Sequence, residues 1–376
     1  LVFRMKKNAV GLATIAILSS MVLVTLVGAA SIYAGKKDYL ASATPHDYSV
    51  AGNKVDLTST KKLMDDFLIK TGEQANEEVA VSYLLFGIKN QETNKLTVFT
   101  KNERKVVPKS IVLVFSQETF KQLTGKELNL SSNQIALYTK NKTLKTQKSL
   151  SIDGKNYQIH RQLGDFINKK IPNIYKIIVS DYSYLVVPDI KIFESSMKGT
   201  SITQATYVGV NVKNPTHDAK KNLDLLDQIA GEATKQLDSQ TTGVPVSYFS
   251  ANSRYDAEGM VNGFVGGTFF IGIFLSIIFM LGTVLVIYYK QISEGYEDRE
   301  RFVILQKIGL DDLQVKQTIR KQVLTVFFLP LIFSFIHLAF AYHMISLIVR
   351  IIGVLNPDLM LVVTIIVCGV FFLAYI

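Results

Sequence analysis

Four long apolar runs alternate with charged sequence along this chain. None of them contains Asp, Glu, Lys or Arg, and one central charge would cost roughly 2.5–3.5 kcal/mol on insertion into a bilayer. Each run has about 18 residues or more, which is enough for a transmembrane helix. The pattern therefore predicts four membrane spans, over residues 8–35, 259–289, 323–349 and 359–376.

The two ends of the chain carry further information. The apolar region of a secretory signal peptide has only about 7–15 residues, so the longer first run is predicted to be a retained helix. The sequence begins with Leu1 instead of Met, and it stops inside the fourth run at Ile376. We therefore expect an internal fragment of a longer protein, with a truncated last span.

Basic residues predict the orientation of the spans. Lys and Arg are enriched in cytoplasmic loops close to membrane helices. They occur in the flank 1–7 and in the connector 290–322, so both are predicted to be cytoplasmic. The segment 36–258 then lies outside the cell, and 350–358 is a short outside loop. Lys36 and Lys37 oppose this locally, but long domains are translocated largely regardless of charge.

The long segment 36–258 mixes helical and strand periodicities, which predicts a mixed α/β domain with room for two subdomains. The stretch after Pro188 and Asp189 is expected to be a loop. Helices are expected over 58–70, 118–123 and 215–240. Strands are expected over 79–88, 96–100, 110–116, 135–139, 157–160, 175–180, 184–187, 207–212 and 244–249. The predicted fold class is an α-helical membrane protein with a large extracellular α/β domain inserted between its first and second helices.

Composition narrows the class of protein. The chain is 48% hydrophobic and only 19% charged, as expected for membrane spans joined to soluble sequence. Its net charge of +10 is spread out, and it has no Arg-rich stripe that would indicate nucleic acid. Lys far outnumbers Arg in 36–258, which fits either genome composition or a cationic face for an anionic lipid or cell-wall precursor.

Candidate catalytic chemistry is absent from the sequence. The single cysteine, Cys368, lies in an apolar run, so it can form neither a disulfide framework nor a thiolate metal site. His46, His160 and His217 are scattered, and no phosphate-binding loop or G-x-S-x-G motif occurs. We predict no catalytic, cofactor or metal site, so any use of ATP must come from a partner.

Small and polar residues mark two of the spans. Gly263, Gly266 and Gly267 open the second span at a spacing that lets helices approach closely, and a flexible joint is an equal alternative. In the third span, Pro330 predicts a kink, while His337 and His343 are expected to form interfacial hydrogen bonds.

The connector 290–322 contains an amphipathic helical pattern. It is either a helix on the membrane surface or a docking helix for a cytoplasmic subunit. Gly309 fits the end of this helix, and Asp311 or Asp312 can cap the next one, which runs into the third span. The candidate coupling residues are an apolar stripe and the charges around it: Arg299, Arg301, Phe302, Leu305, Lys307, Ile308 and Gly309.

The order of one span, a large outside domain and three spans resembles the FtsX-like permease module. The connector EDRERFVILQKIGLDDLQVKQTIRKQ is similar to the motif of that family. The opening FRMKKNAVGLATIAILSSMVLVTL is similar to the second half of the bacitracin-export type of Gram-positive bacteria. The resemblance covers the spans and the connector, and it rests only on size and position in the outside domain.

The resemblance implies a non-catalytic permease subunit of an ABC transporter in the plasma membrane, working with a separate ATPase. Such permeases have about ten spans, of which this chain would supply the last four. Many protect against peptide antibiotics that hold lipid-linked cell-wall precursors, and some signal to a membrane histidine kinase. The implied partners are therefore the ATPase, a histidine kinase, membrane lipids, and a peptide antibiotic or a lipid-linked precursor.

Two other functions remain open. The same module could serve lipoprotein release or cell-division signalling, which a lipoprotein substrate or a hydrolase partner would decide. A non-transport membrane sensor would need a cytoplasmic output domain, and none is visible in 290–322. A membrane enzyme is weakened by the absence of an acidic, His or Ser cluster at the spans.

Overall fold

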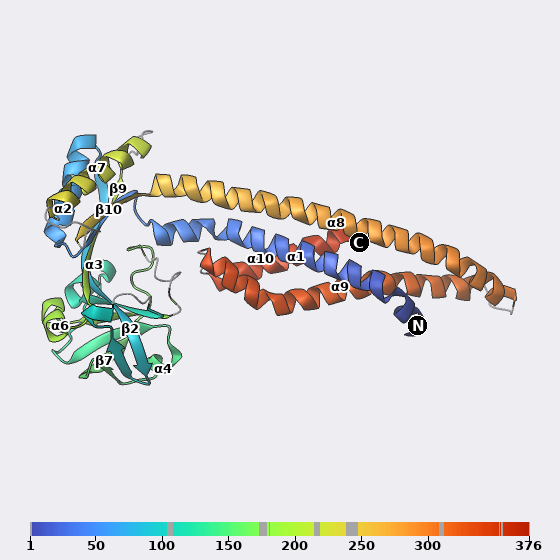
Figure 1. The fold of residues 1–376 in the computed structure, drawn as a ribbon, viewed down its shortest axis with the longest axis horizontal. Coiled ribbons are helices and arrows are strands. Elements are labelled where there is room, and N and C mark those ends of the chain that lie inside the picture. Colours follow the sequence, from blue (N-terminus) through green and yellow to red (C-terminus); the bar gives the residue numbers. More distant parts are fainter. Residues whose placement is uncertain are drawn as a thin grey trace. The chain divides into compact units, whose positions relative to one another are not determined.

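The computed structural model describes residues 2–103, 108–172, 179, 181–213, 219–237, 247–307, 312–352, 354 and 356–375. The chain forms two compact units (Figure 1). We call Leu1–Lys36 with Asn262–Ile376 the helical unit, and Lys37–Val261 the α/β domain.

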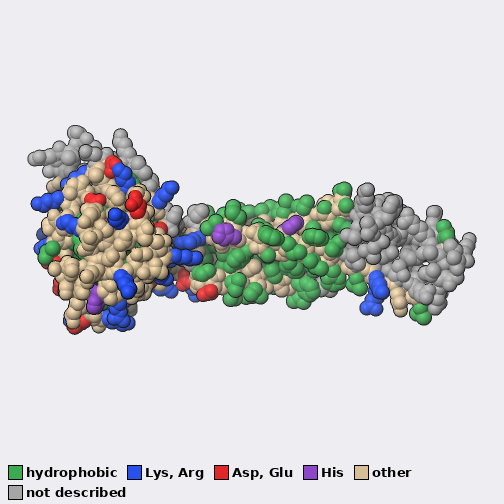
Figure 2. All heavy atoms as spheres, turned by 90° about the horizontal axis from the view of Figure 1, so that it is seen from below, with side chains coloured by type: hydrophobic (Ala, Val, Ile, Leu, Met, Phe, Trp, Pro, Cys, Tyr) green, Lys and Arg blue, Asp and Glu red, His purple; other side chains and the backbone are tan. Residues whose placement is uncertain are grey.

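The helical unit is built from long helices with strongly apolar surfaces. Among the described residues, four helices are long and apolar enough to cross a membrane, and each of their candidate spans overlaps one of the four charge-free runs of the sequence. Apolar side chains cover the outside of these helices (Figure 2), as they must where lipid is the solvent. The helices are α1 (Val2–Ala43), α8 (Arg254–Lys307), α9 (Asp312–Ile351) and α10 (Pro357–Tyr375).

One half of the α/β domain is an open antiparallel sheet in the order β10-β1-β9-β2. Helices α2 (Leu57–Thr71) and α7 (Ala219–Leu237) pack against it. The strands are β1 (Tyr48–Asn53), β2 (Ala75–Glu92), β9 (Thr203–Val212) and β10 (Tyr248–Ser253).

The other half is a closed barrel. The order β2-β3-β6-β7-β5-β8-β4 returns to β2 through a further β2–β4 pairing. Short helices α3 (Gln117–Thr124), α4 (Lys142–Lys145) and α6 (Ile190–Ser196) and the 3₁₀ turn η1 (Lys101–Glu103) connect its strands. The remaining strands are β3 (Lys95–Val98), β4 (Ser110–Ser116), β5 (Gln134–Thr139), β6 (Ser149–Ile152), β7 (Lys155–Gln162) and β8 (Asp181–Val187).

Each half has its own apolar core. Tyr48, Phe67 and Leu226 lie between the open sheet and its two helices. The barrel core contains Phe86 and Val114 among other fully buried side chains. Strand β4 is buried on both faces: Val112 and Val114 belong to the barrel core, whereas Ile111, Leu113 and Phe115 belong to a second apolar cluster. Burial on both faces explains the unbroken apolar sequence of this strand.

Strand β2 belongs to both halves. Its first part pairs with β9, and its last part pairs with β3. At Leu84 it pairs with Gln204 of β9 on one side and with Val114 of β4 on the other. The open sheet and the barrel are therefore joined by continuous hydrogen-bonded backbone.

Several local expectations need correction. The stretch after Pro188 is the helix α6, because Asp189 caps it by accepting from the amides of Lys191 and Ile192, so the predicted loop is wrong. The sequence patterns also missed β1, β6 and α4. The expected strand over 175–180 falls almost wholly outside the described residues, as does the start of the one over 244–249.

Candidate functional site

Helices α1 and α8 approach each other closely at Gly272. A Cβ placed on Gly272 would lie 2.4 Å from the Cβ of Ala29, so only glycine fits without a shift. One helical turn away, the hydroxyls of Thr25 and Ser276 are 2.8 Å apart, and that of Ser276 also donates to the carbonyl of Gly272. A small residue and a hydroxyl pair together hold the two helices close, which is how helices associate in lipid.

Helix α9 contacts α1 through a polar pair inside the apolar region. The Ser20 hydroxyl lies 3.2 Å from Nδ1 of His337. Near the other end of α1, a Cβ on Gly35 would lie 2.4 Å from Val354. Pro330 lies inside α9, where its carbonyl accepts from Ser334. His337 is thus a hydrogen-bonding residue between helices.

The three glycines expected to pack, Gly263, Gly266 and Gly267, are exposed. A Cβ on any of them would meet nothing within 4 Å. Within the described part of the chain the close contact is made by Gly272 instead. A packing role for the three glycines stays a prediction that concerns surfaces other than these helices.

The predicted coupling residues lie at the end of α8. The amphipathic helical pattern of the connector falls on the end of α8, which continues unbroken from Arg254 to Lys307. Arg299 is exposed. The side chains of Arg301, Phe302, Leu305 and Lys307 lie outside the described part, as do Ile308 and Gly309 entirely. Within the described residues, the next helix, α9, begins at Asp312.

Polar contacts among Thr44, Asp47 and Arg254 form where the chain passes between helices and sheet. We call this group of contacts the joint. Helix α1 leads into β1, and β10 leads into α8, while β1 and β10 pair with Tyr48 opposite Ser253. The Arg254 amide donates to the carbonyl of Asp47 at 2.9 Å, and its guanidinium lies 3.3 Å from the Asp47 carboxylate. The same guanidinium donates to the Thr44 carbonyl at 3.1 Å.

The Asp47 carboxylate also reaches the centre of the open sheet. The second oxygen of this carboxylate accepts from the amide of Val212 in β9 at 3.0 Å. The backbone amide of Asp47 donates to the side-chain oxygen of Asn211. Asn211 in turn donates to Glu77 of β2. The joint therefore connects Arg254 through Asp47 to the two long strands β9 and β2.

A buried histidine lies beside the joint. His46 is 4% exposed, and its Nδ1 lies 2.8 Å from the hydroxyl of Tyr207. Gly209 makes room for it, because a Cβ there would lie 2.4 Å from the His46 ring. Burial lowers the pKa of His46 to about 4, despite the partly opposing charge of Glu77, so the ring is neutral at pH 7.

The joint consists of an ion pair and backbone hydrogen bonds, with the neutral His46 beside it. Among the described residues no three His, Cys, Asp or Glu side chains gather as a metal site would require.

Comparisons with known proteins are consistent with this membrane architecture. No family model matches the chain. Three relatives come from Bacillus subtilis strain 168. The chain is 35% identical over 72 residues to the ABC transporter permease protein YxdM, covering 19% of this chain and 12% of that protein. It is 26% identical over 140 residues to the bacitracin export permease protein BceB, covering 37% of this chain and 19% of that protein. It is 30% identical over 92 residues to the uncharacterized ABC transporter permease YvcS, covering 24% of this chain and 13% of that protein.

The 1.5 Å crystal structure of a Bacillus anthracis chain described as a lipoprotein aligns with 48% of this chain and 92% of its own, at 11% identity. Its TM-score of 0.26 is too low to carry an argument about fold.

The similarity places the chain in the class of ABC transporter permeases, as a multi-pass protein of the cell membrane. One of the similar permeases is named a bacitracin export permease. The matches span less than a fifth of each relative's length, at 12%, 19% and 13%.

Sequence reasoning missed the joint. Asp47 and Arg254 carry no motif, and 207 positions separate them. The only usable signal was local, in that each charge lies where an apolar helix meets a strand.

Proposed function

We propose that this chain is a permease subunit that transmits the motion of a separate ATPase across the membrane to its α/β domain, which lies outside the cell. The joint between Asp47 and Arg254 carries this proposal. Helices α1 and α8 continue from the candidate spans to the joint without a break in helical structure. A change in the separation of these two helices would therefore act directly on the paired strands β1 and β10.

The ATPase would act on the cytoplasmic end of α8. In this proposal Phe302, Leu305 and Ile308 form the apolar contact, and Arg299, Arg301 and Lys307 surround it, with Gly309 ending the helix. Because α8 is a single helix from Arg254 to Lys307, a push at one end reaches the other without a flexible linker. The chain itself would hydrolyse nothing.

The α/β domain would recognise a peptide antibiotic, or the lipid-linked cell-wall precursor that the peptide holds. Two observations support this role: BceB, a relative, is named a bacitracin export permease, and the barrel half carries many Lys residues. A membrane histidine kinase is a further partner that the family resemblance implies. Antimicrobial-peptide resistance or sensing is the proposed outcome.

Docking of the ATPase is tested by substituting Phe302→Asp and Leu305→Asp together in the complete permease. Loss of a buried aromatic anchor at an interface often costs about 2 kcal/mol or more. The double variant should insert in the membrane at normal levels and lose the ATPase on co-purification. Val303→Asp, an exposed position on the same helix, is the matched control and should retain it. Unchanged co-purification of the double variant would rule out this docking role.

Recognition is tested by removing the domain while keeping its attachment. Asn53 pairs with Tyr248, so residues 55–246 can be replaced by a short glycine turn that preserves the β1–β10 pair. The shortened permease should insert and fail to protect cells from bacitracin-like peptides. If it is made at normal levels and protects as well as the intact protein, the domain is not the recognition element.

A further inference from the structure

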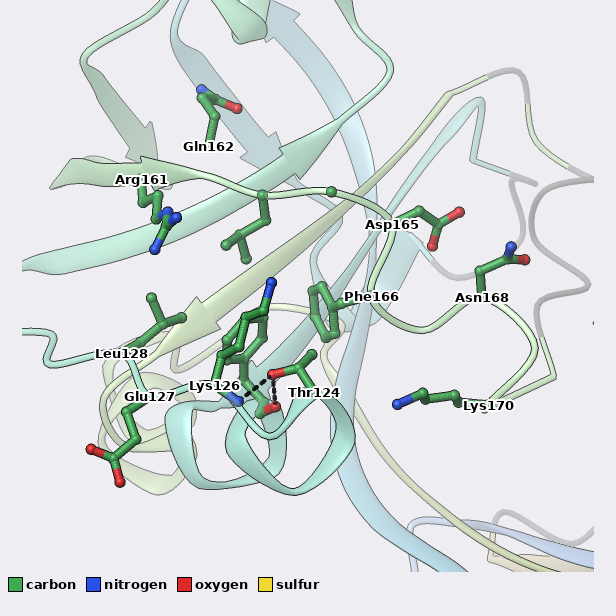
Figure 3. Close-up of a pocket in the computed structure, with 13 residues that line it drawn as sticks. Thr124, Lys126, Glu127, Leu128, Arg161, Gln162, Asp165, Phe166, Asn168 and Lys170 are labelled. Atoms are coloured by element: carbon green, nitrogen blue, oxygen red, sulfur yellow. Dashed lines mark hydrogen bonds between the residues drawn. The ribbon is translucent and has the colours of Figure 1, made fainter.

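The barrel half carries a cavity of about 430 Å³ between the end of α3 and the loop that follows β7. Figure 3 shows its walls. Lys126, just after α3, and Arg161, near the end of β7, extend from opposite walls into the space between them. The cavity lies wholly within the α/β domain and is separate from the joint.

The loop wall is held in place from several sides. The ring of Phe166 packs edge-on against Phe115, Phe120 and Tyr184 at centroid distances of 5.4, 5.0 and 5.8 Å. The amine of Lys170 donates to the carbonyl of Leu123, the last buried residue of α3. A wall fixed in this way is pre-organised, so a ligand would lose little free energy in ordering it.

The charges in this cavity favour an anion. Neither Lys126 nor Arg161 forms an ion pair with any other described residue, whereas Glu127 is paired with Lys121 at 2.6 Å. Asp165, the other acidic residue of the lining, lies on the far side of Phe166 from Arg161 (Figure 3). The guanidinium of Arg161 and the amine of Lys126 can both donate hydrogen bonds to the oxygens of a carboxylate or a phosphate ester.

Part of the cavity lining is apolar. Phe120, Leu128, Leu163 and Phe166 contribute this part. Phe120 and Leu128 are buried, and they belong to one apolar cluster with Val186 of the barrel wall. A free inorganic ion would leave this surface unused, whereas an anionic group attached to an apolar body would cover it.

We propose that this cavity binds an oxyanion group, carboxylate or phosphate ester, carried on an apolar body. The oxyanion lies between Arg161 and Lys126, and the apolar body lies on Phe166 and Leu163. The proposal rests on the proposed recognition role of the α/β domain and gives it a site. Lys169, next to Lys170, pairs with Asp38 of α1 at 3.2 Å, so the loop that contacts the ligand also contacts the first helix.

The test is a titration of the complete permease in nanodiscs of zwitterionic lipid, using short probes that stay monomeric. Hexyl phosphate and hexanoate carry the two candidate oxyanions, hexanol lacks the charge, and inorganic phosphate lacks the apolar body. Saturable binding of at least one hexyl oxyanion is expected, at least about tenfold tighter than that of hexanol or inorganic phosphate. A preference for hexyl phosphate would identify a phosphorylated lipid as the source, and a preference for hexanoate would identify an acidic peptide.

Two variants assign the binding to this cavity. Arg161→Gln and Lys126→Gln change exposed side chains that have no described ion-pair partner, so the fold should be retained. Each should weaken binding of the preferred probe about tenfold, the size of one charge-assisted hydrogen bond. Lys142→Gln, an exposed lysine of α4 that does not line the cavity, is the control and should bind normally.

Three outcomes would overturn the proposal. They are absence of saturable binding by both oxyanions, equal binding of inorganic phosphate, and unchanged binding in both cavity variants. The titration needs neither the ATPase nor transport. Failure here therefore removes the cavity as a site, whereas unimpaired protection by the domain-deleted permease removes the recognition role.

Discussion

The guanidinium of Arg254 lies 3.3 Å from the carboxylate of Asp47, at the place where the chain enters and leaves its α/β domain. The two side chains are 33% and 12% exposed, so water screens the pair only in part. Since Asp47 also accepts from the amide of Val212, one carboxylate joins the start of α8 to the central strands.

Asp47→Ala should loosen the open sheet. It leaves the Val212 amide without its acceptor and Arg254 without its counter-charge, a loss of about 2–3 kcal/mol. Hydrogen exchange of the β1 and β9 amides, measured in nanodiscs, should accelerate by one to two orders of magnitude, about as that free energy implies. Lys121→Gln breaks an exposed pair with Glu127 and should leave the same amides unchanged.

A double-mutant cycle with Arg254→Gln separates the ion pair from the backbone hydrogen bond. The effects of the two substitutions on the free energy of opening should be non-additive, because each removes the same ion pair. Normal exchange in Asp47→Ala would show that the joint does not hold the strands together.

The stability of the α/β domain should depend on pH through His46. Burial holds its folded pKa at about 4, below its ordinary value of 6.5. A depressed folded pKa contributes stability that is complete above pH 6.5 and is lost as the pH falls toward 4, because only the unfolded chain takes up the proton in that window. The contribution is at most about 3 kcal/mol.

His46→Gln should remove this part of the pH dependence. Denaturant unfolding followed by the near-ultraviolet circular dichroism of tyrosine, between pH 4.5 and 7.5, would measure it. His160→Gln, at an exposed position of β7, is the control. Its free energy of unfolding should change with pH as steeply as that of the original protein. Equal slopes in the original protein and in His46→Gln would contradict the assignment.

The contact of Gly272 with Ala29 predicts a rescue. Gly272→Ala should weaken the packing of α1 against α8, since the new Cβ would lie 2.4 Å from that of Ala29. Overpacking of this kind costs about 1–3 kcal/mol. Adding Ala29→Gly should restore the thermal stability of the permease in detergent.

Gly266→Ala is the matched control, because a Cβ there would meet nothing within 4 Å. It should be neutral if this part of α8 faces lipid, and destabilising if the glycine packs against another part of the permease. Failure of Ala29→Gly to improve Gly272→Ala would refute the proposed α1–α8 contact.

The predicted orientation can be tested by cysteine labelling in whole cells. Cys368→Ala removes the native thiol. In that background, Lys142→Cys should react with a membrane-impermeant thiol reagent, and Arg299→Cys should react only after the cells are opened. Both positions are exposed in their own units. Labelling at position 299 but not at 142 in intact cells would reverse the orientation.

The sequence was informative where structure is determined locally. The apolar runs correspond to helices because lipid requires a continuous apolar surface. Strand β4 was predicted with its correct ends, because Ser110–Ser116 is apolar throughout its interior. Strand β1 was missed, because its sequence YSVAGN has weak β-propensity and the strand depends on pairing with β9 and β10, far away in the chain.

The site was harder to predict for the same reason. Glycine spacing pointed to Gly263, Gly266 and Gly267, yet the close contact is at Gly272, since spacing does not reveal which helix face meets α1. Likewise the cavity brings Lys126 and Arg161 together from separate connections of the barrel, and neither position carries a motif.

Strand β2 has a consequence for how the α/β domain unfolds. Its residues Ala75–Glu92 run from the open sheet into the barrel, and near Leu84 both neighbours are bonded to it at once. There is thus no flexible segment in this strand at which one half could melt while the other stays intact. The two halves should behave as a single cooperative folding unit, so destabilisation in either one lowers the melting temperature of both.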